Sequence, residues 1–231
     1  FYTRIISGGH LSPAILFYNI ATRTVGEIGI KDCMVFDEVA KIKFINADEM
    51  MGKLKDYMES SHFERGPKKT TSTCSLVFMG NVDVKGFIPV EDFTYILPEF
   101  MRDSAFVDRI NGIIPGWKLP KIKKPELHLS QNYGFSTDYF SEILHELRKV
   151  DFQTELKSVI DLENVTIRDY KSIYKMLSGM LKILFPNKNW QAGELDEIIR
   201  FCTGYREMVC EWLHKMAPGE FERKKITHKI K

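Results

Sequence analysis

Two adjacent carboxylates, Asp37 and Glu38, directly follow four largely apolar residues at positions 33–36. An apolar run of this kind is typical of a strand that is buried on both faces of a parallel sheet. The two acids would then lie at the carboxyl end of the strand, where open α/β sheets bind ligands. One acid there can hold a Mg²⁺ ion beside a phosphate group, and the other can polarise a water molecule. A strand that ends in a solvated acidic turn explains the same residues equally well.

The 231 residues are enough for one large domain or two small ones, and 44% hydrophobic with 28% charged residues is typical of a globular protein. The net charge of +2 is too small to indicate nucleic-acid binding by itself. No stretch approaches the roughly 20 apolar residues of a membrane span, and no signal peptide opens the chain, so we expect a cytoplasmic protein without membrane contacts. The 4 cysteines lack the spacing of a zinc site, which favours reduced and buried thiols.

The elements that would position the two acids alternate between strands and helices in the first half of the chain. Apolar runs predict strands at 2–7, 33–38, 74–80 and 110–114, and helical spacing predicts helices at 12–20, 49–59 and 98–106. The polar stretch 60–73 is predicted to be an exposed loop or hairpin. It carries Arg65, Lys68 and Lys69, which either lie in solvent or contact a ligand.

The pattern changes in the second half of the chain, where a connector rich in Pro and Lys at 119–124 leads into a segment without predicted strands. Helices are predicted at 137–150, 167–184 and 194–216. The middle helix opens with the pattern of a capping box at 166–169. The basic tail that ends the chain is predicted to be frayed or to form a junction. The sequence therefore predicts an α/β subdomain at 1–120 and a helical subdomain at 121–231.

The order of these parts resembles the core of an AAA+ ATPase, a branch of the P-loop NTPases. Residues 36–40 resemble a Walker B segment, and residues 75–81 resemble the sensor 1 strand. Residues 105–110 resemble the arginine-finger segment of the Lon and MCM branches, and residues 166–169 resemble sensor 2. The resemblance implies an α/β fold with a parallel sheet of the P-loop-NTPase type, followed by a small all-helical lid domain.

Several strings resemble one family more closely, the BrxL-like, Lon-related proteins of BREX phage-defence systems. These strings lie at 6–9, 16–19, 55–60, 114–117 and 178–183. They cover nearly the whole chain, and their combination is specific although no single string is.

The resemblance implies roles for five residues in ATP hydrolysis. Asp37 would bind Mg²⁺, Glu38 would orient or deprotonate the attacking water, and Asn81 would position the same water. Arg109 would reach the γ-phosphate in the neighbouring subunit of a ring, and Arg168 would contact phosphates from the lid.

Other interpretations of these polar residues stay open. Asn81 can simply end a strand at a turn. Arg109 can form a structural ion pair with Asp103 or Asp108. Arg102 is a second candidate for the arginine finger.

One part of the AAA+ core is missing, because the sequence contains no G-x-x-x-x-G-K-[ST] phosphate-binding loop. The family places this loop and its strand directly before the segment that matches Phe1, so we expect a sheet that is incomplete at its N-terminus. We also expect this chain alone to bind and hydrolyse ATP poorly. The Ser-Lys pair of Lon-type proteases belongs to a domain beyond the lid, so nothing in this sequence predicts peptidase chemistry.

Two classes of function follow from these expectations. In the first, the chain is most of the ATPase motor of a BREX defence protein, which forms a homo-oligomeric ring and acts on double-stranded DNA. Arg65, Lys68 and Lys69 would then face the DNA in the central channel. A related alternative is the ATPase module of an ATP-dependent Lon-type protease. In the second class, the chain is a non-catalytic oligomerisation or binding module.

Overall fold

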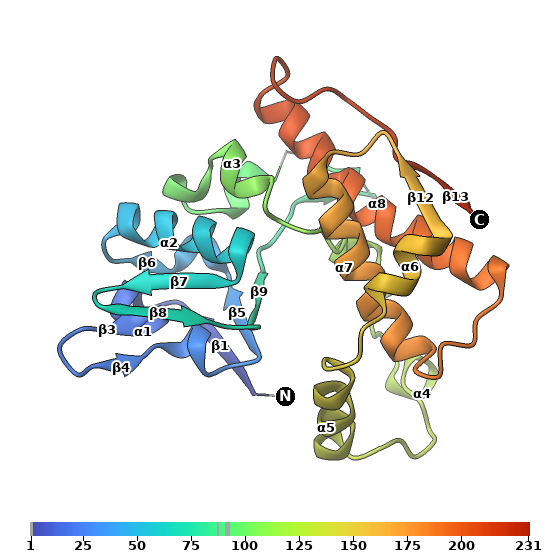
Figure 1. The fold of residues 1–231 in the computed structure, drawn as a ribbon, viewed down its shortest axis with the longest axis horizontal. Helices are drawn as coiled ribbons and strands as arrows, with labels where there is room; N and C mark the ends of the chain where they lie inside the picture. Colours follow the sequence, from blue (N-terminus) through green and yellow to red (C-terminus); the bar gives the residue numbers. More distant parts are fainter. Residues whose placement is uncertain (1, 87, 91–92) are drawn as a thin grey trace. The chain divides into compact units, whose positions relative to one another are not determined.

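The computed structural model describes residues 2–86, 88–90 and 93–231, and Figure 1 shows the elements that they form. Residues 1, 87, 91 and 92 belong to the predicted subdomain 1–120 and lie outside the described residues. Two compact units make up the chain. Unit 1 comprises Phe1–Asp83, Pro89–Ile110 and Cys210–Glu222, and unit 2 comprises Val84–Ile88, Asn111–Val209 and Arg223–Lys231. The predicted boundary after residue 120 stays a prediction.

Unit 1 contains most of the short strands of the chain. Its elements are β1 (Thr3–Ser7), β2 (His10–Leu11), α1 (Pro13–Leu16), β3 (Tyr18–Asn19), β4 (Thr24–Val25), η1 (Glu27–Gly29), β5 (Cys33–Asp37), η2 (Val39–Lys41), β6 (Lys43–Phe44), α2 (Ala47–Ser60), β7 (His62–Arg65), β8 (Lys68–Thr71), β9 (Ser75–Phe78), η3 (Thr94–Ile96), η4 (Glu99–Met101) and α3 (Ser104–Val107). The first helix begins as its sequence indicates, because the Ser12 hydroxyl accepts a hydrogen bond from the amide of Ile15 at 3.4 Å. Pro13 occupies the first helical position, where its missing amide hydrogen costs no hydrogen bond.

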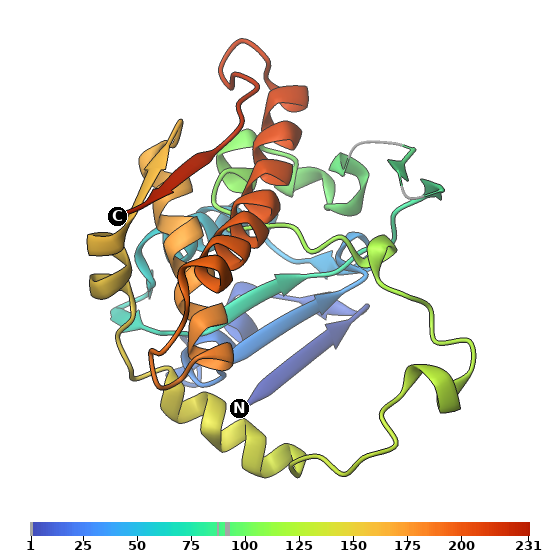
Figure 2. The same ribbon diagram turned by 90° about the vertical axis from the view of Figure 1, so that its right-hand side faces the viewer.

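Three parallel strands form the main sheet of unit 1 in the order β1-β5-β9, with β5 in the centre (Figure 2). The register aligns Ser7 with Asp37 on one side of β5 and Phe36 with Phe78 on the other. Because parallel strands run in the same direction, their carboxyl ends meet at one edge of the sheet. The predicted α/β class with a parallel sheet is confirmed, and it brings Asp37 to this edge.

The two faces of the sheet are covered unequally. Met34 and Phe36 are fully buried, and the rings of Phe36 and Phe78 stack with their centroids 5.0 Å apart. On the opposite face, Ile5 and Val77 are 62% and 39% exposed. The prediction that β5 is buried on both faces is therefore wrong, because the aromatic rings that pack on the sheet in unit 1 gather over the Phe36 face.

The region after β9 departs from the predicted elements. Residues 98–106 form two short helices instead of one, because the Asp103 carboxylate accepts a hydrogen bond from the Ala105 amide and starts a new helix there. Residues 110–114 form no strand. Within unit 2, the Ile113 amide instead donates a hydrogen bond to the Tyr205 carbonyl of the helix at Ala192–Met216, at 3.1 Å.

Unit 2 is mainly helical. Its elements are β10 (Val84–Lys85), η5 (Gly116–Lys118), α4 (Pro125–His128), α5 (Thr137–Leu147), α6 (Gln153–Val159), β12 (Ile160–Glu163), α7 (Ile167–Leu184) and β13 (Thr227–Ile230), while β11 (Ile88–Pro89) and α8 (Ala192–Met216) each span the division between the units. Apolar side chains of α6, α7 and α8 form one core, which includes Phe152, Ile173, Leu177, Leu181 and Ile199. The predicted capping box at the start of α7 is present.

The C-terminal tail is ordered, so the expectation of a frayed end is wrong. β13 pairs with β12 in an antiparallel register that runs from Ile160 opposite Ile230 to Glu163 opposite Thr227. Ile226, just before the strand, is buried in the core of unit 2. The tail therefore contributes a strand and an apolar side chain that local patterning did not reveal.

Helix α5 is less buried than its apolar pattern predicts. Tyr139 and Phe140 are 58% and 42% exposed, although both belong to the stripe that was expected to be core. These side chains are exposed because α5 lies at the periphery of unit 2 (Figure 1).

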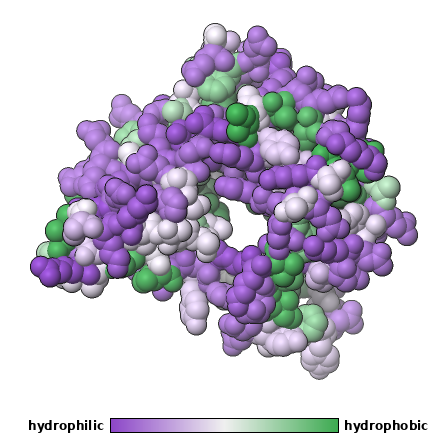
Figure 3. Space-filling view, in the orientation of Figure 1, coloured by the Kyte–Doolittle hydropathy of each residue, from purple (hydrophilic) through white to green (hydrophobic). Residues whose placement is uncertain are grey.

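The described helices include none that is both long enough and apolar enough to cross a bilayer. The face of the molecule shown in Figure 3 is mostly hydrophilic, and its hydrophobic side chains lie in small separate groups.

Candidate functional site

Glu38 and Asn81 meet at the carboxyl edge of the sheet. The side-chain amide of Asn81 donates a hydrogen bond from Nδ2 to Oε1 of Glu38 at 3.4 Å. The backbones beside them are joined as well, since the Val39 amide donates to the Met79 carbonyl and the Met79 amide donates to the Phe36 carbonyl. Strand pairing therefore brings together two polar side chains that are 43 positions apart in the sequence.

The backbone of Glu38 is left-handed, with φ 46° and ψ 53°. This conformation costs a residue other than glycine on the order of 1 kcal/mol or more, and surrounding contacts must maintain it. One such contact is an ion pair between Nζ of Lys41 and Oε1 of Glu38 at 2.8 Å. The side chain of Glu38 is 37% exposed, so its carboxylate is held at the sheet edge and stays accessible from solvent.

Asp37 is the last residue of β5 and is half-buried. Its side chain leaves the sheet on the face opposite Phe36, because side chains alternate along a strand. A magnesium ion in a nucleotide site takes one or two carboxylates and keeps several waters, so a single carboxylate at this edge fits such an ion. The described residues contain no group of three or more His, Cys, Asp or Glu side chains suited to a metal, so they offer no cage of protein ligands alone.

Arg109 is held against helices of unit 1. Its Nη1 donates to the Ala105 carbonyl at 2.6 Å, and its Nε lies 3.8 Å from Oε2 of Glu59 at the end of α2. Asp103, one of the two acids predicted as a partner, instead pairs with Lys55 at 3.0 Å. With 18% of its side chain exposed, Arg109 has a structural contact that the sequence did not reveal, and its role as an arginine finger stays a prediction.

The predicted basic cluster lies on the β7–β8 hairpin, and its three members have different surroundings. Arg65 is 15% exposed, because its Nε donates to Glu49 Oε1 at 2.8 Å and its Nη1 donates to the Tyr18 carbonyl at 2.6 Å. Lys68 and Lys69 are exposed. The hairpin therefore presents two lysines to solvent and uses the arginine to fasten itself to the rest of unit 1.

Arg168 belongs to unit 2, where it is the second residue of α7 and is half-buried. The next residue, Asp169, points into the unit and is 1% exposed. A contact between Arg168 and phosphate stays a prediction.

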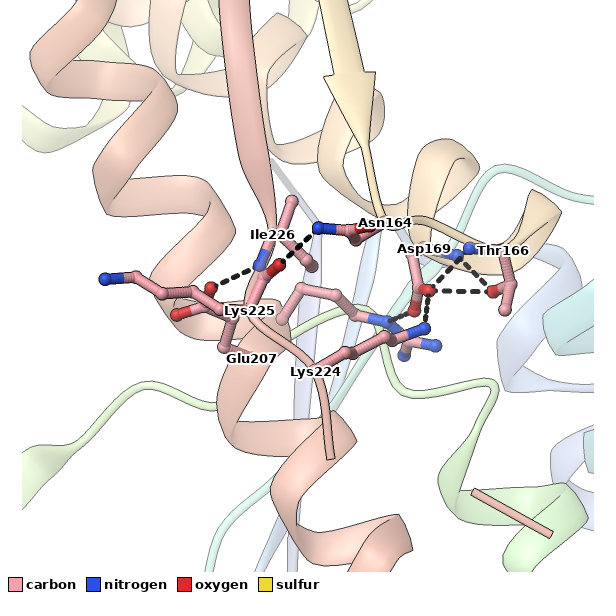
Figure 4. A network of polar contacts seen from close by, with 8 residues as sticks. Asn164, Thr166, Asp169, Glu207, Lys224, Lys225 and Ile226 are labelled. Carbon is pink, nitrogen blue, oxygen red and sulfur yellow. Dashed lines mark hydrogen bonds and ion pairs between the residues drawn. The ribbon is translucent and has the colours of Figure 1, made fainter. Parts of the chain in front are cut away.

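Asp169 is the centre of a buried polar cluster, which Figure 4 shows together with its neighbours. Its Oδ2 accepts hydrogen bonds from the amide and the hydroxyl of Thr166, each at 2.8 Å. Its Oδ1 accepts from Nε of Arg206 at 2.7 Å, and Nζ of Lys224 contacts Oδ2. Arg206 is fully buried, so its positive charge is shielded from water and is balanced by the Asp169 carboxylate.

The partners of Asp169 also fix its ionisation. Burial opposes the charged form, but the hydrogen bonds from Lys224 and Thr166 and the charge of Arg206 outweigh it. They hold the pKa of the Asp169 carboxyl well below its usual range. The Asp169 carboxyl is therefore ionised at neutral pH in the folded protein.

Sequence reasoning missed both cationic partners of Asp169. Arg206 lies between Cys202 and Val209 on the apolar stripe of α8, and a charge on such a stripe is a signal for a buried ion pair. Lys224 gave no local signal, because its contact depends on the path of the C-terminal segment.

A parallel sheet with a carboxylate and an amide joined at its carboxyl edge is an arrangement expected of an ATPase domain. A sequence model of the family "Lon-like protease BrxL-like, ATPase domain" matches residues 1–227 of the chain. The chain belongs to this family. An ATPase domain implies the use of a nucleotide.

Two proteins described as "Lon-like protease BrxL" are similar to the chain. The protein from Bacillus cereus (strain H3081.97) is 38% identical over 221 residues, which cover 94% of this chain and 32% of that protein. The protein from Escherichia coli O9:H4 (strain HS) is 34% identical over 220 residues, covering 94% of this chain and 31% of that protein. The chain thus spans about a third of the length of the curated relatives it matches.

The polar cluster leads to a prediction about stability. The substitution Asp169→Asn removes the negative charge of Asp169 from the buried Arg206, and we expect unfolding in urea to show a loss of about 3–5 kcal/mol at pH 7. Asp161→Asn is the matched control, because Asp161 pairs with Lys231 on the surface and its loss should cost about 1 kcal/mol or less.

The pH dependence follows from the lowered pKa of Asp169. The stabilisation is complete above the pKa of about 3.9 that the carboxyl has in the unfolded chain, and it is lost as the pH falls toward the folded-state pKa. The wild-type protein should therefore lose stability below about pH 4 more steeply than Asp169→Asn. Equal slopes for the two proteins would contradict the assigned role of Asp169.

Proposed function

We propose that the chain is the hydrolytic part of a ring-forming ATPase motor that acts on DNA in phage defence. The hydrogen bond between Asn81 and Glu38 is the observation that carries this proposal, because it unites an acid and an amide where a nucleotide would bind. Glu38 takes the proton of the attacking water or orients that water. Asn81 holds the same water through its side-chain amide.

Asp37 is the residue of this chain that would hold Mg²⁺, directly or through water. The ion, when bound with ATP, neutralises charge on the phosphates. The ion pair with Lys41 keeps the Glu38 carboxylate at the sheet edge. These residues fit the hydrolytic side of a nucleotide site.

The sequence contributes no phosphate-binding loop to the site, since it lacks the G-x-x-x-x-G-K-[ST] pattern. We therefore expect turnover from the full-length protein and none from the 231 residues alone. The same observation favours one second candidate, a non-catalytic binding module. Both similar proteins carry "protease" in their names, and a role for this chain as the ATPase module of a protease is a variant of the main proposal.

The decisive variant for the hydrolytic role is Glu38→Gln in the full-length protein. The amide keeps the size and the contact with Asn81 but cannot accept a proton from water, so nucleotide binding should persist while turnover falls about 10²-fold or more. Steady-state phosphate release and nucleotide binding measure the two effects. Glu99→Gln, at an exposed position of unit 1, is the matched control and should leave both unchanged. Wild-type turnover by Glu38→Gln would refute the assignment.

Assembly into a ring gives Arg109 a second role, as a finger that reaches the nucleotide of the neighbouring subunit. Arg109→Ala should leave nucleotide affinity within about twofold and lower turnover of the ring about 10³-fold. Rings mixed with Glu38→Gln subunits should regain part of the activity, because an intact arginine then faces an intact acid at some interfaces. Glu59→Ala removes the ion-pair partner and is the control. If Glu59→Ala lowers turnover as much as Arg109→Ala, the arginine is structural.

DNA would contact the exposed lysines of the β7–β8 hairpin. Each phosphate contact contributes about 0.9 to the slope of log affinity against log salt concentration, so replacing Lys68 and Lys69 by alanine should reduce that slope by about 2. Filter binding of duplex DNA at several salt concentrations measures it. Lys118→Ala with Lys121→Ala, a pair from unit 2, is the control. An unchanged slope in the hairpin variant would remove these two lysines from the DNA surface.

A further inference from the structure

The C-terminal segment reaches Asp169 from an anchored backbone. Just after Lys224, the Lys225 carbonyl accepts a hydrogen bond from Nδ2 of Asn164 at 3.3 Å, and the Ile226 amide donates to Oε1 of Glu207 at 2.7 Å (Figure 4). Strand β13 follows and pairs with β12. Lys224 therefore enters the polar cluster from a fixed position and is not a freely rotating surface lysine.

The cluster fixes the first turn of α7, and Arg168 stands in the same turn. Successive residues of a helix point in directions about 100° apart, so Asp169 faces the interior while Arg168 leaves the helix on another side. Any rotation of this turn moves both side chains. For an arginine that extends roughly 8 Å from the helix axis, a rotation of about 20° would displace the guanidinium by roughly 3 Å. Displacements of this size abolish a phosphate contact.

We propose that Lys224 and Arg206, acting through Asp169, are positioning residues for Arg168. The C-terminal segment 223–230 thereby controls a phosphate contact made at the start of α7. The inference rests on the proposed ATPase function and on the role that the family resemblance implies for Arg168, contact with a phosphate of the nucleotide. Arg206 is fully buried, so its loss would damage the fold; Lys224, with 24% of its side chain exposed, is the residue to vary.

The test replaces Lys224 by methionine in the assembled full-length protein, which keeps the length of the side chain and removes its charge. We expect the KM for ATP to rise about tenfold with kcat within about twofold, because a lost phosphate contact weakens binding in the ground state and the transition state alike. Lys224→Arg keeps the charge and should restore the wild-type KM. Lys229→Met is the matched control, since Lys229 lies in the same segment but pairs with Glu163 on the surface.

A double substitution separates positioning from a general loss of stability. In the background of Arg168→Ala, Lys224→Met should raise the KM no further, because the contact that it positions is already absent. The inference is overturned if Lys224→Met behaves like Lys229→Met, or if the effects of the two substitutions on KM are additive.

Hydrogen exchange keeps the inference testable whether or not the enzyme turns over. The amides of residues 169–173 should exchange at least tenfold faster in Lys224→Met than in wild type, and Lys229→Met should leave them unchanged. Unaltered exchange in Lys224→Met would by itself refute the role of Lys224 in fixing the first turn of α7. Normal turnover in Glu38→Gln would instead refute the proposed function, so the two failures are distinguishable.

Discussion

Parallel pairing along β5 is the constraint on which the candidate site depends. Hydrogen bonds to β1 on one side and β9 on the other align the carboxyl ends of the three strands. The stacked rings of Phe36 and Phe78 fix the same register from the buried face, since a shift by one residue would turn them to the opposite side. Asp37, the last residue of β5, and Glu38 and Asn81, which follow the ends of β5 and β9, reach one edge because of this register.

In unit 2 a buried ion-pair cluster holds distant segments together beside the apolar core. A single carboxylate, Asp169, lies between a fully buried arginine and a lysine, and it also completes the cap of α7. Removing water from such groups is costly, so the arrangement survives because each partner offers a hydrogen bond as well as a charge. The same group thus caps the start of α7 locally and holds three segments together that are distant in the sequence. That dual use connects the C-terminal segment to the first turn of α7, which also carries Arg168.

Two independent observations support the interpretation as an ATPase domain: membership of the BrxL-like ATPase family and the geometry of the sheet edge. The matching relatives are about three times as long as the chain. Within the chain, the basic residues differ in how far they take part in structural contacts. Arg65 and Arg109 both fasten elements of unit 1, whereas Lys68 and Lys69 are exposed, and Lys69 pairs only loosely, at 3.7 Å, with Glu64 on the opposite strand of the hairpin.

The sequence by itself determined features that depend on neighbours along the chain. The apolar run before Asp37, the capping box of α7 and the stripes of its long helices are local patterns, and each predicts its element. Only the tertiary structure decided which distant groups meet. Arg206 contacts Asp169, and the tail pairs with β12, because folding brings together segments that are far apart in the sequence. Local sequence patterns do not predict such contacts. The predicted strand at 110–114 does not form for a similar reason. A strand needs a pairing partner, and local propensity does not show whether one is present.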